Sequence, residues 1–388
     1  MNYKGILEST IGIPFSSGNA IRVLKNGKEI FPAMLDAISG ARHEIDFLTF
    51  VYWKGDIAGR FARLLGKKAK EGVGVRVILD CFGAAFMPRE LVEHMEKCGV
   101  EVEWIRPVKR WKIWKSDNRT HRKVLICDGN IAFTGGVGIA EEWEGDARNP
   151  SEWRETHFRV EGPAVRGLQS AFLENWIETG HQLHEGLPWQ EDDGEVRLPD
   201  EQSIKEIPIQ VVRTSASVLW SDIMILYRTL VGMAQESIRI TTAYFNPNEA
   251  MVTLLCEAAE RGVEVHIMIP GEHIDKRVAN IAGGDRFQPL LKAGVNLWFY
   301  QKTMLHAKSI VIDDYVSCIG SANFNHRSML KDDEVNMIAL SAELAELLVN
   351  HFQEDLTYCD KIKQDQWEQR SLMQRGLEVV SKFFKQQI

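Results

Sequence analysis

The sequence is poor in several features that often reveal a protein's class. Its six cysteines include no C-x-x-C pair, which disfavours a zinc knuckle or a thioredoxin-type redox site. Acidic residues number 54 against 46 lysines and arginines, and the resulting net charge of −8 argues against a globally basic nucleic-acid-binding protein. No apolar run approaches the roughly 18–20 residues that span a bilayer. The first residues, MNYKGILEST, do not read as a signal peptide. We therefore expect a cytoplasmic protein, or one lying peripherally on the cytoplasmic side of the cell membrane.

The chain has the composition of a globular protein, and its sequence contains an internal repeat. Hydrophobic residues make up 45% of the 388 residues and charged residues 26%, which is typical of a folded protein of two or three domains. AMLDAISGARHEIDFLTFVYW in the first half corresponds to LYRTLVGMAQESIRITTAYF in the second, and HRKVLICDGNIAFTGG corresponds to HAKSIVIDDYVSCIGS. Helical and strand patterns alternate within each copy, which predicts an α/β fold with a parallel or mixed sheet.

The repeat sets the expected domain boundaries. Residues 1–183 form the first copy, an acidic, turn-rich linker covers 184–207, and 208–360 form the second copy. Repeats of this length usually pack face to face as a pseudo-dimer with a site at their interface. Residues 361–388 have apolar side chains at helical spacing beside basic ones. They predict an amphipathic helix, which either lies in a membrane interface or packs on its own domain or a second subunit.

One motif is kept in both copies. Each follows the pattern H-x-K-x4-D-x6-G-[GS], and every position of the second lies 185 residues after the first (306 minus 121). The motif residues are His121, Lys123, Asp128, Gly135 and Gly136 in the first copy and His306, Lys308, Asp313, Gly320 and Ser321 in the second. Two matches in register are a far more specific signal than one.

The motif suits phosphate chemistry. A histidine and a lysine two residues apart on a strand point to the same face, so an imidazole stands beside an ammonium that can hold a phosphate oxygen. The glycines allow backbone N–H groups to approach the same anion. Two such pairs could supply a nucleophile and a general acid. The alternatives are histidines with a purely structural role and a metal site. A lysine beside each histidine would repel a cation, so we expect neither a metal nor another cofactor.

These residues resemble the phospholipase D superfamily, and within it the bacterial cardiolipin synthase branch. The resemblance covers roughly residues 30–360. It is carried by DNRTHRKVLICDGNIAFTGGVGIAEEW, WRETHFRVEGPAVRGLQSAFLENW and YQKTMLHAKSIVIDDYVSCIGSANFNHRSMLKDDEVN. It implies two similar phospholipase D-like α/β/α domains with the active site between them. The first copy departs from the pattern, because it has Gly138 where the second copy and many relatives have asparagine.

The resemblance also implies roles for the motif residues. His121 attacks the phosphodiester to form a phosphohistidine, and His306 protonates the leaving alcohol and later deprotonates the acceptor. The sequence is nearly symmetric, so the choice of nucleophile rests on analogy. Lys123, Lys308, Ser321 and Asn323 hold the phosphoryl oxygens, and Asp128 and Asp313 brace the turns between strands. An acidic residue after each motif orients each histidine. We expect Glu155 to orient His121 and Glu334 to orient His306; the alternative is that both are surface carboxylates.

A basic segment precedes the first motif histidine. Residues 106–123 contain eight basic residues and one acidic residue, with tryptophans interleaved. Its side chains suit an anionic membrane surface, single-stranded nucleic acid, or simple solvation. We favour contact with phospholipid headgroups through Arg110, Trp111, Lys112, Trp114 and Lys115.

The expected function is that of a phosphatidyltransferase. It would make cardiolipin from two phosphatidylglycerol molecules, release glycerol, and work on an anionic phospholipid surface without a metal. The alternatives are hydrolysis of phospholipid to phosphatidic acid, a superfamily phosphodiesterase acting on nucleic acid, which the net charge disfavours, and a binding module, which would be expected to have lost a motif residue.

Overall fold

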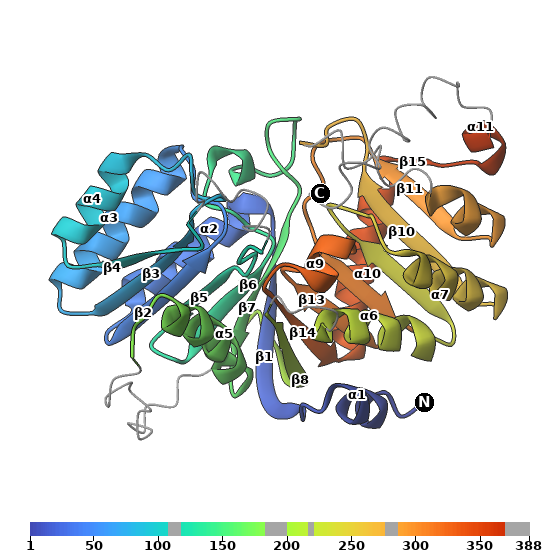
Figure 1. Cartoon of the computed structure of the whole chain (residues 1–388), viewed down its shortest axis with the longest axis horizontal. Helices are drawn as coiled ribbons and strands as arrows, with labels where there is room; N and C mark the ends of the chain where they lie inside the picture. Colours follow the sequence, from blue (N-terminus) through green and yellow to red (C-terminus); the bar gives the residue numbers. More distant parts are fainter. Residues whose placement is uncertain (108–117, 183–199, 216–220, 276–285, 369–388) are drawn as a thin grey trace.

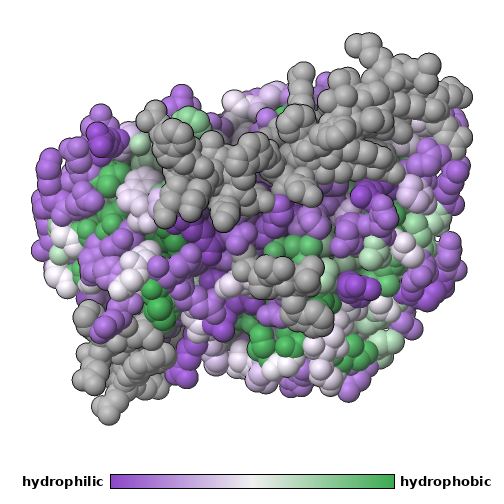
Figure 2. All heavy atoms as spheres, in the orientation of Figure 1, coloured by the Kyte–Doolittle hydropathy of each residue, from purple (hydrophilic) through white to green (hydrophobic). Residues whose placement is uncertain are grey.

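The computed structural model describes residues 1–107, 118–182, 200–215, 221–275 and 286–368 (Figure 1). Their strands form a single sheet of 15 strands that runs across the whole molecule, with helices on both faces. On the face seen in Figure 2 the surface is mainly hydrophilic, and apolar side chains gather only in separate small patches. Among the helices of these residues, none combines the length and the apolar character that crossing a membrane requires.

The first half supplies seven of these strands. Its elements are α1 (Tyr3–Ile11), β1 (Ser16–Lys25), α2 (Asn26–Gly40), β2 (Glu44–Thr49), α3 (Asp56–Lys70), β3 (Gly74–Asp80), α4 (Arg89–Lys97), β4 (Glu101–Ile105), β5 (Val124–Cys127), β6 (Ile131–Gly135), β7 (Thr156–Glu161) and α5 (Ala164–Glu178). A short 3-10 helix, Glu141–Trp143, lies between β6 and β7.

The second half repeats this order. Its elements are β8 (Ile204–Thr214), α6 (Asp222–Met233), β9 (Ser237–Thr241), α7 (Glu249–Glu260), β10 (Glu264–Pro270), β11 (Asn296–Tyr300), β12 (Ser309–Ile312), β13 (Val316–Gly320), α9 (His326–Leu330), β14 (Glu334–Leu340), α10 (Ala342–Leu356), β15 (Cys359–Lys361) and α11 (Gln364–Glu368).

The strand order shows the internal symmetry. From the centre outwards the first half reads β1-β7-β6-β5-β2-β3-β4, and the second reads β8-β14-β13-β12-β9-β10-β11-β15. In each half the inner strands pair antiparallel, whereas β2 with β3 and β9 with β10 pair parallel. The halves join where β1 pairs antiparallel with β8. The expected α/β fold and its duplication are therefore confirmed. The two copies join edge to edge in one sheet and not face to face as expected, because their central strands β1 and β8 hydrogen-bond to each other.

The helices bury their apolar sides on the sheet. In α3 the buried side chains recur at helical spacing, at Ile57, Phe61 and Leu65 among others, so one face of the helix packs inward. Helices α2, α3 and α4 cover one face of the first half, and α1, α6 and α7 cover one face of the second. The opposite face has one core under α5 and α10 that contains strand residues of both halves. This shared core fixes the halves against each other.

Two of the expected domain boundaries can be compared with the strands that the structure places there. Strand β8 begins at Ile204, so the last four residues of the expected 184–207 linker belong to the second half's central strand. Residues 359–361 form β15 at the edge of the sheet, and α11 follows. The rest of the expected C-terminal helix, residues 369–388, lies outside the described residues.

Candidate active site

Each motif histidine lies on a short segment that reaches across to the other half. The His121 N–H donates to the Asp333 carbonyl at 2.9 Å, and the Asp333 N–H donates to the Arg119 carbonyl at 2.8 Å. The second histidine repeats this arrangement, because the His306 N–H donates to the Arg154 carbonyl at 2.7 Å. The backbone of each histidine is thus fixed by the residue that precedes a glutamate of the opposite half.

The histidine–glutamate pairs are consequently exchanged between the halves. His121 Nδ1 lies 3.0 and 3.1 Å from the two carboxylate oxygens of Glu334. His306 Nδ1 lies 2.7 Å from Glu155 Oε2. Both glutamates are fully buried. The expected pairing within each half is therefore wrong, although the four residues are the ones expected.

The sheet order explains this correction. Glu155 precedes β7 and His121 precedes β5, and β6 lies between these two strands. Two strand spacings amount to roughly 10 Å, which is beyond hydrogen-bonding distance. The same separation holds in the second half, where β13 lies between β12 and β14. Each glutamate instead lies beside the histidine segment of the other half.

The two motif lysines are buried among these pairs. Lys308 Nζ lies 3.0 Å from His306 Nδ1, and Lys123 Nζ donates to the His121 carbonyl at 2.8 Å. Burial lowers the pKa of Lys308 to about 8, against the opposing effect of Glu155. Burial likewise lowers the pKa of Lys123, against the opposing effect of Glu334. The pKa of Lys123 also responds to Lys308 and Glu155, so the groups share one electrostatic environment.

The pKa values of the two orienting glutamates shift in opposite directions. Burial and then Lys308 lower the pKa of His306 to about 4, which makes its imidazole neutral at pH 7. Burial would raise the pKa of the Glu155 carboxyl, but Lys308 and His306 together hold it below the ordinary value. An ionised Glu155 accepts from Nδ1–H of His306, which leaves Nε2 as the basic nitrogen. Burial raises the pKa of Glu334, and Lys123 and then Ser321 oppose that rise.

The turns after β6 and β13 pack against the glutamates. Gly135 has a φ of 148°, and a Cβ at Gly136 would lie 2.4 Å from a Glu155 carboxylate oxygen. In the second half, Ser321 Oγ donates to Glu334 Oε2 at 2.5 Å. Gly136 therefore makes room for the orienting carboxylate.

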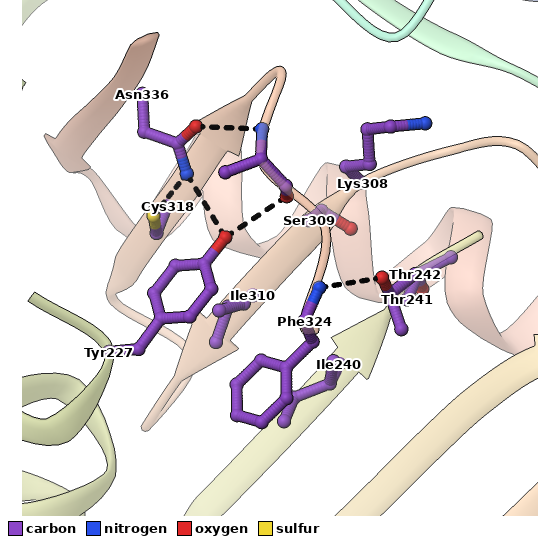
Figure 3. A pocket seen from close by; sticks show the side chains of 11 residues that line it. Tyr227, Ile240, Thr241, Thr242, Lys308, Ser309, Ile310, Cys318, Phe324 and Asn336 are labelled. Carbon is purple, nitrogen blue, oxygen red and sulfur yellow. Dashed lines mark hydrogen bonds between the residues drawn. The ribbon is translucent and has the colours of Figure 1, made fainter. Parts of the chain in front are cut away.

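Buried side chains hold the second of these turns in place. Tyr227 donates to the Ala322 carbonyl at 3.0 Å, Asn336 accepts from the Ala322 N–H at 3.1 Å, and Thr242 accepts from the Phe324 N–H at 3.0 Å (Figure 3). A cavity of about 10 Å³ lies among these residues and beside Lys308, whose ammonium points away from the tyrosine. Such a volume holds about one water molecule, so the cavity is no substrate site.

Comparisons with known proteins agree with this geometry. The family model described as cardiolipin synthase, PLD-like domain, matches residues 34–145 and 227–356, one segment in each half. Cardiolipin synthase 1 of Bacillus anthracis is 32% identical over 369 residues, which cover 95% of this chain and 72% of the relative. The chain belongs to the phospholipase D superfamily, in its cardiolipin synthase branch.

Other relatives extend this result. The major cardiolipin synthase of Bacillus subtilis is 32% identical over 370 residues, covering 95% of this chain and 75% of the relative. The crystal structure of phosphatidylserine synthase from Haemophilus influenzae matches with a TM-score of 0.72 at 13% identity and covers all of both chains. At that identity the match shows the phospholipase D fold alone.

The motif aspartates of this phospholipase D-superfamily chain lie at the far ends of the strands. Asp128 accepts from the N–H groups of Arg42, His43 and Glu44 at 2.8–3.1 Å. Asp313 accepts from the N–H groups of 235–237, and it also accepts from the Tyr3 hydroxyl at 2.6 Å. Each carboxylate ties the turn between two motif strands to the start of a neighbouring strand. This geometry fits bracing rather than contact with substrate.

Trp143 is a site residue that the sequence reasoning missed. Its indole Nε1–H donates to Glu155 Oε2 at 3.3 Å, and its ring lies edge-on to His306 with centroids 5.2 Å apart. A Cβ at Gly138 would lie 3.0 Å from the Trp143 ring. The indole therefore occupies space beside the position where the second half has Asn323.

The internal repeat points to Trp143 through the residue at the equivalent position of the second half. Counting 185 residues on from Trp143 gives Ser328, which hydrogen-bonds to Glu334 and opposes the rise in the pKa of that carboxyl. A tryptophan in one half and a serine in the other thus perform the same task, because each donates to the glutamate that orients a histidine. The 185-residue offset of the motif gives this correspondence, but the unlike residue types conceal it.

The expected headgroup contacts, Arg110, Trp111, Lys112, Trp114 and Lys115, lie outside the described residues. The segment that contains them begins after Arg106 and ends before Arg119. Those two residues are described and meet, since Arg119 donates to the Arg106 carbonyl at 2.8 Å.

Proposed function

We propose that this protein makes cardiolipin by transferring a phosphatidyl group from one phosphatidylglycerol to another, with release of glycerol. The observation that carries the proposal is the exchanged pair of histidine–glutamate contacts with a buried lysine beside each histidine. The relatives at 32% identity that are named cardiolipin synthases support the choice of acceptor. The exchanged contacts support the chemistry.

In the first step His121 is the nucleophile. With its Nδ1 held by Glu334, Nε2 attacks the phosphorus of phosphatidylglycerol. The N–P bond forms, the bond from phosphorus to the glycerol oxygen breaks, and His306 gives that oxygen a proton. Lys123 and Lys308 hold the phosphoryl oxygens, with Ser321, Asn323 and the N–H groups after Gly135 and Gly136 nearby. The negative charge of the bound phosphodiester raises the pKa of His306 from its low value. His306 can therefore carry the proton that it gives to the leaving glycerol oxygen.

In the second step the glycerol hydroxyl of another phosphatidylglycerol attacks the same phosphorus. His306, now neutral, takes the proton from that hydroxyl as the P–N bond to His121 breaks. The products are cardiolipin and a free His121. Water in place of the hydroxyl would yield phosphatidic acid. The side chains supply the positive charge in both steps, so the proposed reaction needs no metal.

His121 suits the nucleophile's role better than His306. Its side chain is 12% exposed, whereas that of His306 is 7% exposed. His306 also lies against the rings of Trp143 and Trp153. These ring contacts restrict access to His306. A residue that only carries a proton tolerates such restriction, whereas a nucleophile must reach the phosphorus of a bulky lipid.

The substrate places the proposed reaction at a membrane. Phosphatidylglycerol resides in bilayers, so we propose that the protein acts peripherally on the cytoplasmic side of an anionic phospholipid surface. We propose that residues 110–115 contact its headgroups and that 361–388 form an amphipathic helix. We also propose that residues 1–183 and 208–360 form two separate domains.

The test is a product analysis. Purified protein is incubated with phosphatidylglycerol vesicles in EDTA, and separately with single-stranded DNA. Cardiolipin and glycerol in equal amounts support the proposal. Phosphatidic acid alone would indicate hydrolysis, and cleaved DNA with unchanged lipid would indicate a nuclease. Loss of activity in EDTA would contradict the metal-free mechanism.

A further inference from the structure

Two exposed phenylalanines lie on one short segment beside the site. The segment, residues 81–88, joins β3 to α4 and contains Phe82, 58% exposed, and Phe86, 76% exposed. Apart from Met1, these are the most exposed large apolar side chains among the described residues. Single exposed apolar residues are ordinary, but two on one segment beside a functional site indicate a contact surface.

The segment is held firmly. Asp80, fully buried at the end of β3, accepts from the Phe82 and Gly83 N–H groups at 2.9 Å each. Trp53 Nε1–H donates to the Gly83 carbonyl at 2.7 Å. The Trp53 ring also contacts that of Phe86, with centroids 6.1 Å apart. The two rings are therefore presented to solvent by a fixed backbone and do not pay a large ordering cost on binding.

The same groups hold His121. The second carboxylate oxygen of Asp80 accepts from the Thr120 N–H at 3.3 Å, one residue before the histidine. The Phe50 ring lies 5.2 Å from the His121 ring, and Gly83 packs so closely on Phe50 that an added Cβ would lie 2.6 Å from its ring. The exposed segment and the proposed nucleophile thus belong to one rigid unit.

A buried ion pair adjoins the apolar pair. The Arg119 guanidinium lies over the Phe82 ring, 5.6 Å from its centroid, and it is itself buried and 3.8 Å from the Asp80 carboxylate. The two rings are therefore the groups presented to solvent here, and aromatic side chains favour the headgroup level of a bilayer. A protein partner would need a larger apolar area than two rings on a segment of eight residues.

We propose that Phe82 and Phe86 insert into the surface of an anionic phospholipid bilayer and bring His121 to the level of the lipid phosphates. This inference rests on the proposed function for its substrate, but it concerns described residues other than the expected headgroup contacts. It explains why a protein with a net charge of −8 exposes two apolar rings on the rigid unit that contains its proposed nucleophile.

Vesicle binding tests the proposal without turnover. In a His121→Ala background, Phe82→Ser/Phe86→Ser is compared with the unaltered pair by sedimentation with vesicles of phosphatidylcholine and phosphatidylglycerol. We expect at least a tenfold loss of affinity, because two rings leave the interface. Tyr315→Ser is the matched control: it is 39% exposed, lies in the turn between β12 and β13 at the far end from His306, and should change affinity less than twofold.

Turnover separates a surface role from a catalytic one. In the active background, the double variant should lose at least tenfold in kcat/KM on phosphatidylglycerol vesicles. It should match the unaltered protein on short-chain phosphatidylglycerol kept monomeric in solution. Unchanged vesicle affinity, or an equal loss on monomers and vesicles, would overturn the inference. So would an unaltered protein that runs as a dimer and is dissociated by the double substitution. If the unaltered protein formed no cardiolipin from either substrate, the proposed function would fail while the binding result still decided the role of the rings.

Discussion

His306 Nδ1 lies 2.7 Å from Glu155 Oε2, although the two residues belong to different halves of the chain. Glu334 and His121 form the reciprocal contact at 3.0 Å. In neither half, therefore, is the motif histidine oriented by a glutamate of the same half. The duplication builds two halves of one site, and the shared sheet and the core under α5 and α10 hold them together.

Replacing Trp143 with phenylalanine tests its role as a positioning residue. The substitution keeps an aromatic ring beside His306 but removes the N–H that donates to Glu155. We expect kcat to fall about tenfold, because hydrogen bonds to charged groups contribute about 1.5–3 kcal/mol. With one donor fewer, Glu155 interacts more strongly with the imidazolium, so the pKa of His306 should rise; ¹⁵N NMR of the imidazole measures it.

Trp153→Phe is the matched control for that substitution. Trp153 also packs against His306, with ring centroids 5.5 Å apart, and phenylalanine keeps much of this contact. We expect kcat to change less than threefold and the pKa of His306 to stay as it was. Equal effects of the two substitutions would show that Trp143 acts through packing alone.

The pKa of Lys308 predicts an alkaline limit on substrate capture. Burial lowers this pKa to about 8 and that of Lys123 to about 7, so the two ammonium groups lose their protons, and their hold on an anionic phosphodiester, as the pH rises through this range. We expect kcat/KM to fall between pH 7 and 9. Because bound phosphate stabilises the ammonium, kcat should fall only at higher pH.

Lys308→Arg provides the comparison for this pH profile. A guanidinium stays charged throughout this range, so the part of the fall near pH 8 should move upward, while the part near pH 7 that comes from Lys123 should remain, even if the overall rate is lower. A kcat/KM profile of the unaltered protein that stays flat to pH 10 would contradict the low pKa of the lysine.

Asp128→Ala should reduce stability far more than catalysis. The substitution leaves the N–H groups of residues 42–44 without their carboxylate acceptor, at a cost of about 2–3 kcal/mol. Chemical denaturation should show this loss, while kcat per folded molecule changes less than threefold. Tyr3→Phe removes a single hydrogen bond to Asp313 and should cost about 1 kcal/mol. A loss of turnover at unchanged stability would place Asp128 in the chemistry instead.

Much of this site could be predicted from the sequence because its signals are local. The spacing of His121, Lys123 and Asp128, and its repetition at His306, predicted the fold, the candidate catalytic residues and a bracing role for the aspartates. The exchange of Glu155 and Glu334 could not be predicted, because it depends on which strand lies between the glutamate and its own histidine. Trp143 was missed because its counterpart, Ser328, has different chemistry. Strand β8 begins inside the expected linker, at Ile204, and the polar, acidic stretch before it conceals this start.

The exchanged pairing is tested most directly with a phosphatidyl ester of p-nitrophenol, a leaving group that needs no proton. In Glu155→Gln only the acid–base histidine is misoriented, so His121 should still attack, release a stoichiometric burst of nitrophenol, and remain as a phosphatidyl adduct found by mass spectrometry. In Glu334→Gln the nucleophile itself is misoriented, and the burst should be absent. A burst in Glu334→Gln but not in Glu155→Gln, or an adduct on His306, would contradict the account.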